Sequence, residues 1–384
     1  MKEKIVFFLP SLEPGGTERN VVNLINYLHD EGRIVSLVLG NKKGDFIKDV
    51  KAGIPIIDLN ASSSLRLFFT LERYFKAQKP DIFISAFPRI NIIVLAAKIF
   101  SRSTTKVMIT EHSVFSMLPV IARNAWRRAF ARAFMPPLAK MLYPKADAII
   151  CVSRGIAQDL SNIIGGAPKI NVVYNPIIND TVYELADLPP DHPWFLNPTT
   201  PVILAVGRLV ACKDYPTLLK AFALVVQTQP AHLVILGDGP EKEALECLAN
   251  KMGLSGQVAF LGFKKNPYAY MKRASVFALS SLQEGFGNVI IEAMACGTPV
   301  VSTDCPVGPG EIITHKESGM LVPVASPEAL AKAIVAILSD ASLAQRFSTR
   351  GKIRAEYFTV KKSVIAYEAI FKELCYTRKK SADY

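Results

Sequence analysis

The alternation of short apolar runs with helical patterns is the feature that most constrains how this 384-residue chain can fold. In the first half, six apolar runs read as buried parallel strands, at 5–9, 34–39, 54–59, 81–87, 106–110 and 148–153. Helical patterns lie between most of them, such as the pattern at 17–32, which ends at Gly32. Strands that alternate with helices in this way predict a doubly wound α/β domain.

A second alternation follows a break in the pattern. The segment 175–201 holds six prolines and many turn-forming residues, which is typical of an interdomain linker. Five further strand-like runs follow it, at 202–207, 232–237, 257–262, 276–281 and 298–303. The tail, 341–378, is helical and has no strand left to pair with, so it could cross back onto the first domain. We therefore predict a first domain at 1–175, a linker at 176–200, a second domain at 201–355 and a returning C-terminal helix at 356–384.

The charge and the apolar segments narrow the class of protein. A net charge of +12 and a sequence pI near 9.3 favour an anionic partner, and nucleic acid, anionic lipid and phosphorylated substrates all qualify. Six cysteines without any CxxC pair favour reduced, cytosolic thiols over a zinc ribbon or a disulfide framework. The apolar run at 5–9 is too short for a signal peptide, and no run approaches the ~18 apolar residues of a transmembrane helix. We expect a soluble or peripheral protein.

The stretch EGFGNVIIEAMACG, 284–297, carries the strongest sign of a ligand site. A glycine-rich turn into a helix offers free N–H groups and a positive dipole end to an anion. Glu284 precedes this turn and Glu292 lies in the helix that follows it. Carboxylates accept hydrogen bonds from hydroxyl groups. The combination predicts a ligand with phosphate and hydroxyls, such as a nucleotide sugar. We expect Glu284 to meet the sugar and Glu292, about two turns into the helix, to reach a ribose; an ordinary polar helix position is the alternative for Glu292.

Other candidate residues follow strands of the second domain, at the sheet edge where open α/β sheets bind ligands. Arg208 and Lys213 come after the first of these strands, and two cations there could clamp a diphosphate; a solvated loop is the alternative. Gly237 in GDGPE ends the next strand, where simple turn chemistry is a strong alternative. Gly262 and Phe263 end the third strand, where the backbone could lie against a base.

The first domain offers weaker candidates. Gly15 and Gly16 lie in PGGTER, between the first strand and the first helix, where exposed amides could meet a phosphate or sugar. This motif is not GxGxxG, so it does not predict a dinucleotide site. The sequence TEHS, 110–113, ends the fifth strand, and its His112 would face a cleft between the domains; a structural histidine is the alternative.

A basic stretch without any acid runs from residue 112 to residue 146. Its cations are Arg123, Arg127, Arg128, Arg132, Lys140 and Lys145. Three aromatic residues spaced by four positions form one helical stripe: Trp126, Phe130 and Phe134. An amphipathic helix lying on anionic lipid has this pattern, and so does a buried aromatic face with solvated arginines. The absence of acids favours the membrane interpretation.

Taken together, these motifs resemble the retaining glycosyltransferases of family 4, which have the GT-B fold of two Rossmann-like doubly wound domains facing a cleft. The resemblance covers nearly the whole chain. Its marks are the E-x7-E pattern of Glu284 and Glu292 with GFG inside it, GR-x4-K with Arg208 and Lys213, GDGP, and GG in the first loop. The set in this order is specific, whereas each motif alone is weak.

The resemblance implies a role for each candidate. Arg208 and Lys213 would hold the donor diphosphate, and Glu292 would hold the ribose. The sugar and its phosphate would meet Glu284 and the backbone of the turn that follows, which comprises Gly285, Phe286, Gly287, Asn288 and Val289.

In the first domain, the resemblance implies that Gly15 and Gly16 close over the donor and that His112 lies near the transferred sugar. The implied catalytic residues are therefore Glu284, His112, Arg208 and Lys213. The reaction implied is transfer of a hexose or N-acetylhexosamine, with retention, from a nucleotide sugar, with UDP favoured over GDP only by family likeness. The stretch 302–312 resembles members that extend lipid-linked oligosaccharides of bacterial surface glycans.

Several further expectations follow from this resemblance and from the motifs. No D-x-D pattern is present, so we expect no metal cofactor. The acceptor would be a lipid-linked oligosaccharide or lipopolysaccharide, reached at the inner face of the cytoplasmic membrane. Three rival functions stay open: a sugar-nucleotide epimerase of GT-B fold, a non-catalytic nucleotide-sugar-binding protein, and a nucleic-acid-binding protein. The last explains the positive charge, but no aromatic–basic motif for single strands is found, so we expect no nucleic acid partner.

Overall fold

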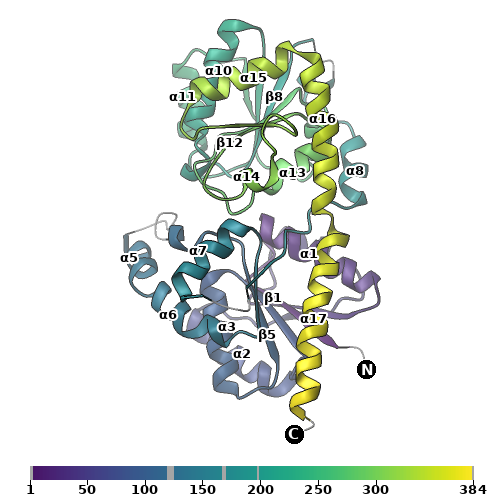
Figure 1. Ribbon diagram of the computed structural model, residues 1–384. Helices are drawn as coiled ribbons and strands as arrows, with labels where there is room; N and C mark the ends of the chain where they lie inside the picture. Colours follow the sequence, from purple (N-terminus) through teal and green to yellow (C-terminus); the bar gives the residue numbers. More distant parts are fainter. Residues whose placement is uncertain (1–2, 119–124, 167–169, 197–198, 383–384) are drawn as a thin grey trace. The chain divides into compact units, whose positions relative to one another are not determined.

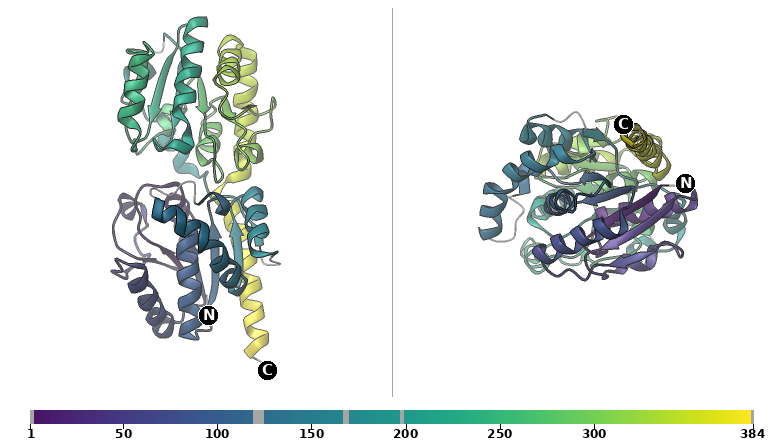
Figure 2. Two further views of the ribbon diagram at one scale, coloured as in Figure 1. Left: turned by 90° about the vertical axis from the view of Figure 1, so that its left-hand side faces the viewer. Right: turned by 90° about the horizontal axis from the view of Figure 1, so that it is seen from below.

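The computed structural model describes residues 3–118, 125–166, 170–196 and 199–382, except for the side chains of 125–127 and 377–382. The chain forms two compact units. Unit 1 comprises Met1–Pro176 and Val360–Tyr384, and unit 2 comprises Ile177–Thr359. Each unit is a parallel sheet with helices on both faces, as Figures 1 and 2 show.

The sheet of unit 1 has seven parallel strands in the order β3-β2-β1-β4-β5-β6-β7. They are β1 (Lys4–Leu9), β2 (Ile34–Leu39), β3 (Ile56–Asp58), β4 (Ile82–Ala86), β5 (Lys106–Glu111), β6 (Ala148–Cys151) and β7 (Ile170–Val172). This is the Rossmann order with a seventh strand added at one edge. The direction of strand addition reverses between β1 and β4, and ligands bind at such a point, at the carboxyl ends of the strands.

Two groups of helices cover the two faces of this sheet. The helices of unit 1 are α1 (Gly16–Asp30), α2 (Ser64–Gln78), α3 (Pro88–Ser101), α5 (Ala125–Ala133), α6 (Met135–Leu142), α7 (Arg154–Ile164) and α17 (Val360–Ala382), with 3₁₀ turns η1 (Asp45–Asp49), η2 (Phe115–Met117) and η3 (Tyr143–Lys145). Alternate residues of β1 point to opposite faces. Phe7 joins the core beneath α1, whereas Phe8 stacks on Phe83 with ring centroids 6.0 Å apart. Phe83 in turn meets Phe75 of α2.

Helix α17 completes the core of unit 1. The helices α2, α3, α6 and α7 pack in succession on one another, on the face opposite α1. On the α1 face, Met108 of β5 and Ile150 of β6 belong to one apolar cluster with Val364, Tyr367 and Phe371 of α17. The C-terminal helix therefore covers the half of this face that α1 leaves open, and it runs beside α1 (Figure 1).

The sheet of unit 2 has six parallel strands in the order β10-β9-β8-β11-β12-β13. They are β8 (Val202–Val206), β9 (His232–Leu236), β10 (Val258–Phe260), β11 (Val276–Leu279), β12 (Val300–Thr303) and β13 (Met320–Val322). Counted from its own first strand, this is again the Rossmann order, and the direction reverses between β8 and β11.

The helices of unit 2 also divide into two groups. They are α8 (Asp180–Asp187), α9 (Pro193–Leu196), α10 (Tyr215–Thr228), α11 (Lys242–Lys251), α12 (Tyr268–Met271), α13 (Asn288–Ala295), α14 (Pro309–Ile312), α15 (Pro327–Ser339) and α16 (Ala341–Ala355), with 3₁₀ turns η4 (Ala211–Lys213) and η5 (Glu356–Phe358). Helices α10, α11 and α15 share one apolar cluster with the sheet. Helix α13 packs on α8, α12 and α16. Here α15, which directly follows the last strand, covers the area that α17 covers in unit 1.

The structure differs from the sequence prediction at three places. Strands β7 and β13 were not predicted, because the apolar run of β7 is interrupted by Asn171 and that of β13 is only three residues long before Pro323. The segment 176–200, predicted as a linker, contains α8 and α9 and belongs to unit 2 from Ile177 onward. Pro189 and Pro190 lie between α8 and α9, and Pro193 lies at the first position of α9, where proline is tolerated. The chain returns to unit 1 at Val360 rather than at residue 356.

Buried side chains explain why 176–200 is part of unit 2. Val182, Ala186 and Phe195 are all buried. The guanidinium of Arg273 donates to the carbonyl oxygens of Ala186 and Leu188, at 3.1 and 3.0 Å. Across the described residues, every helix is too short or too polar to span a lipid bilayer.

Candidate active site

Two loops of unit 2 meet where the strand order reverses. One follows β8 and contains Cys212 and Lys213, and the other follows β11. The amide of Leu282 donates to the carbonyl oxygen of Cys212 at 2.9 Å, and the hydroxyl of Ser280 donates to that of Lys213 at 2.8 Å. These bonds fix the two loops against each other, so residues about 70 positions apart in sequence become neighbours.

Lys213 and Glu284 form an ion pair at this junction. The ammonium of Lys213 donates to Oε1 of Glu284, and the hydroxyl of Ser281 donates to the same oxygen at 2.7 Å. The side chains of Lys213 and Glu284 are 18% and 9% exposed. The stem of Lys213 passes Gly207, where a Cβ would lie 3.7 Å from Cε of the lysine. The pair thus presents a cation and a carboxylate together, each held by a neighbouring element.

The N-terminus of α13 follows Glu284 closely in the chain. Gly287 precedes α13 with a φ of 104°, a conformation that glycine adopts readily. The first turn of α13 contains no acidic residue. The turn is tightly packed, since a Cβ at Gly308 would lie 2.3 Å from the carbonyl oxygen of Phe286. Arg208 is exposed at the end of β8, and its guanidinium has no ion pair or hydrogen bond with any described residue.

Glu292 lies one turn into α13, not two as predicted from the sequence, because the left-handed conformation of Gly287 delays the start of the helix to Asn288. The residue is 8% exposed. The hydroxyl of Tyr268, on α12, lies 3.5 Å from Oε1 of Glu292. A buried carboxylate close to a helix N-terminus is suited to accept a diol.

The predicted glycines at the ends of β9 and β10 have different structural roles. Gly237 has a φ of 139°, and a Cβ there would lie 1.9 Å from the carbonyl oxygen of Gly207. It is therefore required by the close approach of two strand ends. Gly262 has a φ of 68° and no atom within 4 Å of an added Cβ, so the surface beside it is open. Phe263, next to it, is half exposed.

The cysteines near this site are protonated at neutral pH. Burial raises the pKa of Cys305 to about 12, and the charge of Glu284 adds to the shift. Burial and the charge of Glu292 raise the pKa of Cys296 to about 12. Burial is also the main reason that the pKa of Cys212 is raised. Because the thiolate is the nucleophile, none of the three is suited to covalent catalysis.

The glycine turn of unit 1 is occupied by a carboxylate of its own chain. Gly15 caps α1, and Glu18 is the third residue of that helix. A Cβ at Gly15 would lie 2.3 Å from Oε2 of Glu18. A glutamate at this position commonly bonds back to the cap in a capping box. The turn at Gly15 therefore already has a carboxylate of the chain beside it, which sequence reasoning did not anticipate.

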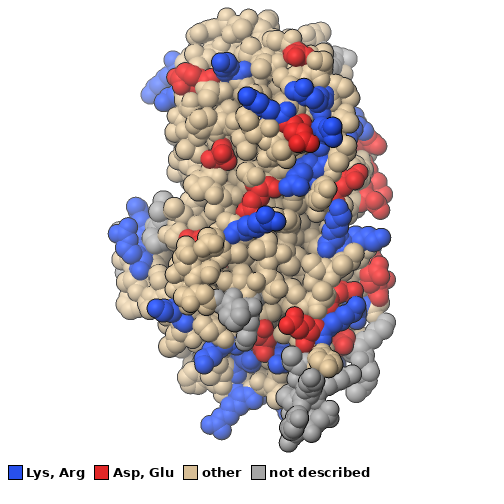
Figure 3. Space-filling view, in the orientation of Figure 1, with Lys and Arg blue, Asp and Glu red and all other residues tan. Residues whose placement is uncertain are grey.

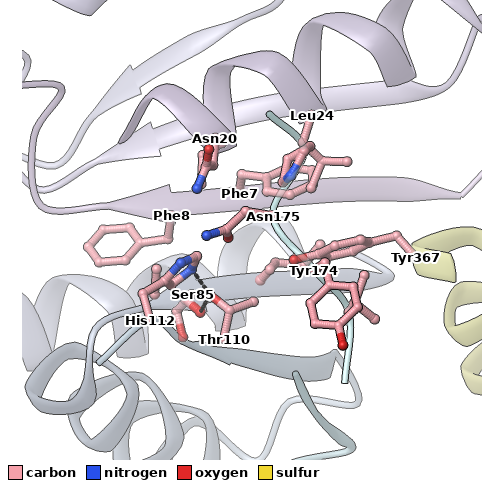
Figure 4. A pocket seen from close by; sticks show the side chains of 15 residues that line it. Phe7, Phe8, Asn20, Leu24, Ser85, Thr110, His112, Tyr174, Asn175 and Tyr367 are labelled. Atoms are coloured by element: carbon pink, nitrogen blue, oxygen red, sulfur yellow. Dashed lines mark hydrogen bonds between the residues drawn. The ribbon is translucent and has the colours of Figure 1, made fainter. Parts of the chain in front are cut away.

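His112 lines a pocket of unit 1 together with residues from β1, β4, α1, α17 and the segment 173–176 (Figure 4). The side chains of Asn20 and Asn175 border the same space (Figure 4). Nε2 of His112 lies 3.1 Å from the hydroxyl of Thr110. Its Nδ1 is buried and has no hydrogen-bond partner among the described residues. Burial lowers the pKa of His112 to about 4, so the imidazole is neutral at physiological pH.

Beside His112, Glu111 is fully buried among neutral groups. Tyr143 donates a hydrogen bond to its Oε1, and so does the amide of Asn91 at 2.8 Å. Asn91 also donates to the carbonyl oxygen of Thr110 and accepts from the hydroxyl of Ser85. Burial raises the pKa of Glu111 to about 7, although both hydrogen bonds oppose the shift. This network connects the end of β5 to the segment that follows α6.

The basic segment is described in part. Arg123 lies outside the described residues, as do the side chains of Trp126 and Arg127. Arg128 and Arg132 are exposed, and basic side chains gather over α5 in Figure 3. Phe130 stacks on Phe134 with ring centroids 5.3 Å apart, and Phe134 remains 57% exposed. The end of the aromatic stripe is therefore at the surface.

Comparison with known proteins decides the family. The family model "Glycosyltransferase Family 4" matches residues 14–180, and the model "Glycosyl transferases group 1" matches residues 191–354. A Campylobacter jejuni protein is 30% identical over 368 residues, which cover 93% of this chain and 96% of that protein. It is named N-acetylgalactosamine-N,N'-diacetylbacillosaminyl-diphospho-undecaprenol 4-alpha-N-acetylgalactosaminyltransferase.

The chain belongs to glycosyltransferase family 4. A second relative of this glycosyltransferase is the lipopolysaccharide core biosynthesis glycosyltransferase LpsE of Rhizobium meliloti, 28% identical over 88% of this chain and 89% of that protein. Among solved structures, Anabaena HepE in complex with UDP and glucose has a TM-score of 0.78, at 20% identity over 97% of this chain and all of that one. The outer core galactosyltransferase WaaB has a TM-score of 0.71, at 20% identity over 98% of this chain and 99% of that one.

These findings confirm the predictions of a GT-B fold and of a retaining hexosyltransferase of family 4, and they do not favour an epimerase or a non-catalytic binding protein. In unit 2 of this glycosyltransferase, Lys213, Glu284 and the turn before α13 are brought together. Gly15, Gly16 and His112 lie in unit 1, where Gly15 and Gly16 belong to the α1 turn and His112 to the pocket.

Several site residues were missed from the sequence. Ser281 and Tyr268 support the two glutamates of unit 2, and Thr110 and Asn91 support the end of β5. None of them was assigned a role, although Thr110 opens the sequence TEHS. The position of Ser281 directly after a buried strand, three residues before Glu284, was the one available signal.

Proposed function

We propose that this glycosyltransferase moves a hexose or N-acetylhexosamine from a UDP-sugar to a lipid-linked oligosaccharide or lipopolysaccharide acceptor in bacterial surface glycan synthesis. The observation that carries the donor part is the Lys213–Glu284 pair beside the acid-free N-terminus of α13, at the reversal of strand order. Names of relatives support the acceptor part. Two Campylobacter jejuni relatives are named for undecaprenol-linked acceptors, and the Rhizobium meliloti relative for lipopolysaccharide core.

In this proposal, unit 2 stabilises the leaving group. Cleavage of the sugar–phosphate bond develops negative charge on the diphosphate, and preorganised cations and amides lower the energy of that charge. Arg208 and Lys213 would neutralise it together with the first amides of α13. Glu284, oriented by Lys213 and Ser281, would accept a hydrogen bond from a hydroxyl of the sugar. Glu292 would accept hydrogen bonds from the ribose diol. The open surface at Gly262 and Phe263 would receive the base.

Unit 1 would act on the sugar and the acceptor. His112 would lie near the transferred sugar, and the turn at Gly15 and Gly16 would close over the donor. Because the cations and helix amides neutralise the leaving group, we propose that no metal is required. The proposal is tested below by adding a chelator.

We further propose that the enzyme works on the inner face of the cytoplasmic membrane. The support is the acid-free basic segment, the exposed Phe134 and the exposed Met141 of α6. Each arginine near an anionic surface contributes about 1 kcal/mol. Replacing Arg123, Arg127, Arg128 and Arg132 with Gln should abolish sedimentation with anionic liposomes. Replacing four exposed basic residues of unit 2 with Gln is the matched control, and equal loss in both variants would contradict a specific membrane face.

A donor and acceptor screen tests the reaction. The enzyme is incubated with UDP- and GDP-linked hexoses and N-acetylhexosamines, with and without a polyprenyl-diphosphate-linked sugar, and products are identified by mass spectrometry. We expect one UDP-sugar to lengthen the lipid-linked glycan by a hexose or N-acetylhexosamine, equally well with EDTA. An isomerised nucleotide sugar without any lengthened product would instead favour an epimerase. Activity lost in EDTA and restored by Mg²⁺ would overturn metal independence.

A further inference from the structure

We infer that Thr110 is a positioning residue, which holds His112 in the tautomer with the proton on Nε2 and leaves Nδ1 as a hydrogen-bond acceptor at the wall of the pocket. The two residues lie two positions apart at the end of β5 and just after it. Thr110 opens the sequence TEHS that contains His112, but the sequence assigned it no role of its own. The inference deepens the proposed function, since it assigns a chemical role to the histidine placed near the transferred sugar.

The hydroxyl group of Thr110 has only one hydrogen to donate, and two possible partners lie close to it. Oγ1 of Thr110 lies 3.1 Å from the carbonyl oxygen of Ser85 and 3.1 Å from Nε2 of His112. A carbonyl oxygen can only accept, so the hydroxyl hydrogen goes to Ser85. Towards His112 the hydroxyl then has only lone pairs to offer. Nε2 must therefore carry the proton and donate it to Thr110.

The opposite arrangement, in which Thr110 donates to Nε2 of His112, would leave a buried N–H without an acceptor. If Thr110 donated to Nε2, the neutral imidazole would carry its proton on Nδ1. That nitrogen is buried without a hydrogen-bond partner among the described residues. A buried N–H without an acceptor is rare and destabilising, whereas a buried acceptor without a donor is better tolerated. The doubly protonated ring would meet the same cost, in line with the lowered pKa of His112.

Thr110 is held rigidly by the sheet. The residue is 3% exposed and belongs to an interior strand, paired with β4 on one side and β6 on the other. Its carbonyl oxygen accepts from the amide of Asn91 at 3.0 Å, and Asn91 is bonded in turn to Ser85 and Glu111. The hydroxyl of Thr110 and the Ser85 carbonyl oxygen that accepts from it therefore both belong to interior strands and have fixed positions. A fixed hydroxyl selects one histidine tautomer instead of following it.

The consequence concerns the ligand group that His112 can meet. A neutral imidazole with a free Nδ1 lone pair accepts a hydrogen bond from a hydroxyl and cannot donate one. The side chains of Asn20 and Asn175 border the same pocket (Figure 4). This part of the pocket is suited to a sugar hydroxyl and not to a phosphate, which at neutral pH mainly accepts.

The tautomer is tested directly by ¹⁵N NMR of imidazole nitrogens in protein labelled at histidine. The chain has five histidines, and the signal missing from the His112→Gln variant identifies His112. In the wild type and in Thr110→Ser, which keeps the hydroxyl, we expect a protonated Nε2 and an unprotonated Nδ1. In Thr110→Val, which has nearly the same shape without the hydroxyl, we expect a mixture of both tautomers. A wild-type Nδ1–H, or an unchanged tautomer in Thr110→Val, would overturn the inference.

Kinetics then test whether the tautomer matters to transfer. With the UDP-sugar selected by the screen, Thr110→Val should lower kcat by about tenfold, the value of one neutral hydrogen bond at its upper range, with KM nearly unchanged. Thr110→Ser should retain most of the activity. If Thr110→Val changes the tautomer but leaves kcat unchanged, the positioning role is wrong. If no donor supports transfer, the proposed function fails, yet the NMR result on the wild type still decides the tautomer.

Discussion

The two glycine turns of this enzyme look alike in sequence but differ in charge. Gly15 and Gly16 lead into α1 of unit 1, and Gly285 and Gly287 lead into α13 of unit 2. In unit 1 the carboxylate of Glu18 lies against the turn, whereas the first turn of α13 has no acid. Exposed amides at a helix N-terminus attract an anion only where no side chain of the protein already supplies one. The comparison therefore favours unit 2 over unit 1 for the principal anion site.

The glutamates near the strand ends show the same contrast. Glu284 of unit 2 is paired with the ammonium of Lys213. Glu111 of unit 1 is held by neutral partners, Tyr143 and Asn91. Unit 2 is thus arranged around charges, and the end of β5 in unit 1 around neutral hydrogen bonds. The following predictions test this division.

The largest effect is expected at the cations of unit 2. Arg208→Ala or Lys213→Ala should lower kcat/KM for transfer by roughly 100-fold or more, because each removes a preorganised charge from the leaving group. Lys251→Ala, which removes an exposed lysine of α11, is the control and should be near wild type. Steady-state kinetics with unchanged thermal unfolding provide the measurement. Near-normal turnover in both site variants would mean that the anion site lies elsewhere.

A smaller effect should separate the two glutamates of unit 2. Glu292→Ala should weaken UDP binding by roughly tenfold or more, the value of a hydrogen bond to a charged group, as measured by calorimetry. Glu284→Ala should leave UDP affinity nearly unchanged and mainly lower kcat, because it meets the sugar, where bonding changes. If Glu284→Ala alone abolished UDP binding, the two roles would have to be exchanged.

Removing the charge of Glu18 should strengthen the binding of the donor. Glu18→Gln removes the charge that lies against the turn at Gly15 while keeping the side-chain shape. If the turn closes over an anionic donor, KM for the nucleotide sugar should fall by roughly two- to fivefold, the value of a charge at a helix terminus. Thermal stability should decrease slightly, since α1 loses a favourable charge. An unchanged or raised KM would show that this turn does not meet the anion.

A separate prediction concerns the pH dependence of stability rather than the rate of transfer. The pKa of Glu111 is raised from 4.5 to about 7, so the folded protein holds a proton that the unfolded chain releases in this range. Its contribution to stability is present below the unfolded pKa and is lost as pH rises through about 7. Glu111→Gln keeps acceptors for Tyr143 and Asn91 but does not ionise. The melting temperature of the variant relative to wild type should therefore rise across this window, and a constant difference would contradict the raised pKa.

The sequence predicted most of the fold because buried parallel strands read as continuous apolar runs, as at 5–9 and 202–207. It missed the edge strands β7 and β13, whose apolar runs are interrupted or very short. It also took the prolines of 176–200 as a sign of a linker, although α8 and α9 lie there. The pairing of Lys213 with Glu284 was within reach, since the two follow neighbouring strands. Glu18 was visible at the third helix position and was overlooked. The bonds of Thr110 and Asn91 depend on side-chain directions that no motif encodes.

Helix α17 has a consequence for how the enzyme is made. Unit 1 consists of two stretches of chain with the whole of unit 2 between them. Chains grow from the N-terminus, and domains fold as units when their residues have left the ribosome. Until Val364 and Phe371 have been synthesised, Met108 and Ile150 have no α17 to cover them on one face of the sheet of unit 1. Unit 2, begun later, has all of its residues first. The last domain to be started is therefore the first that can finish folding, and the growing chain exposes an apolar face to chaperones for as long as unit 2 takes to translate.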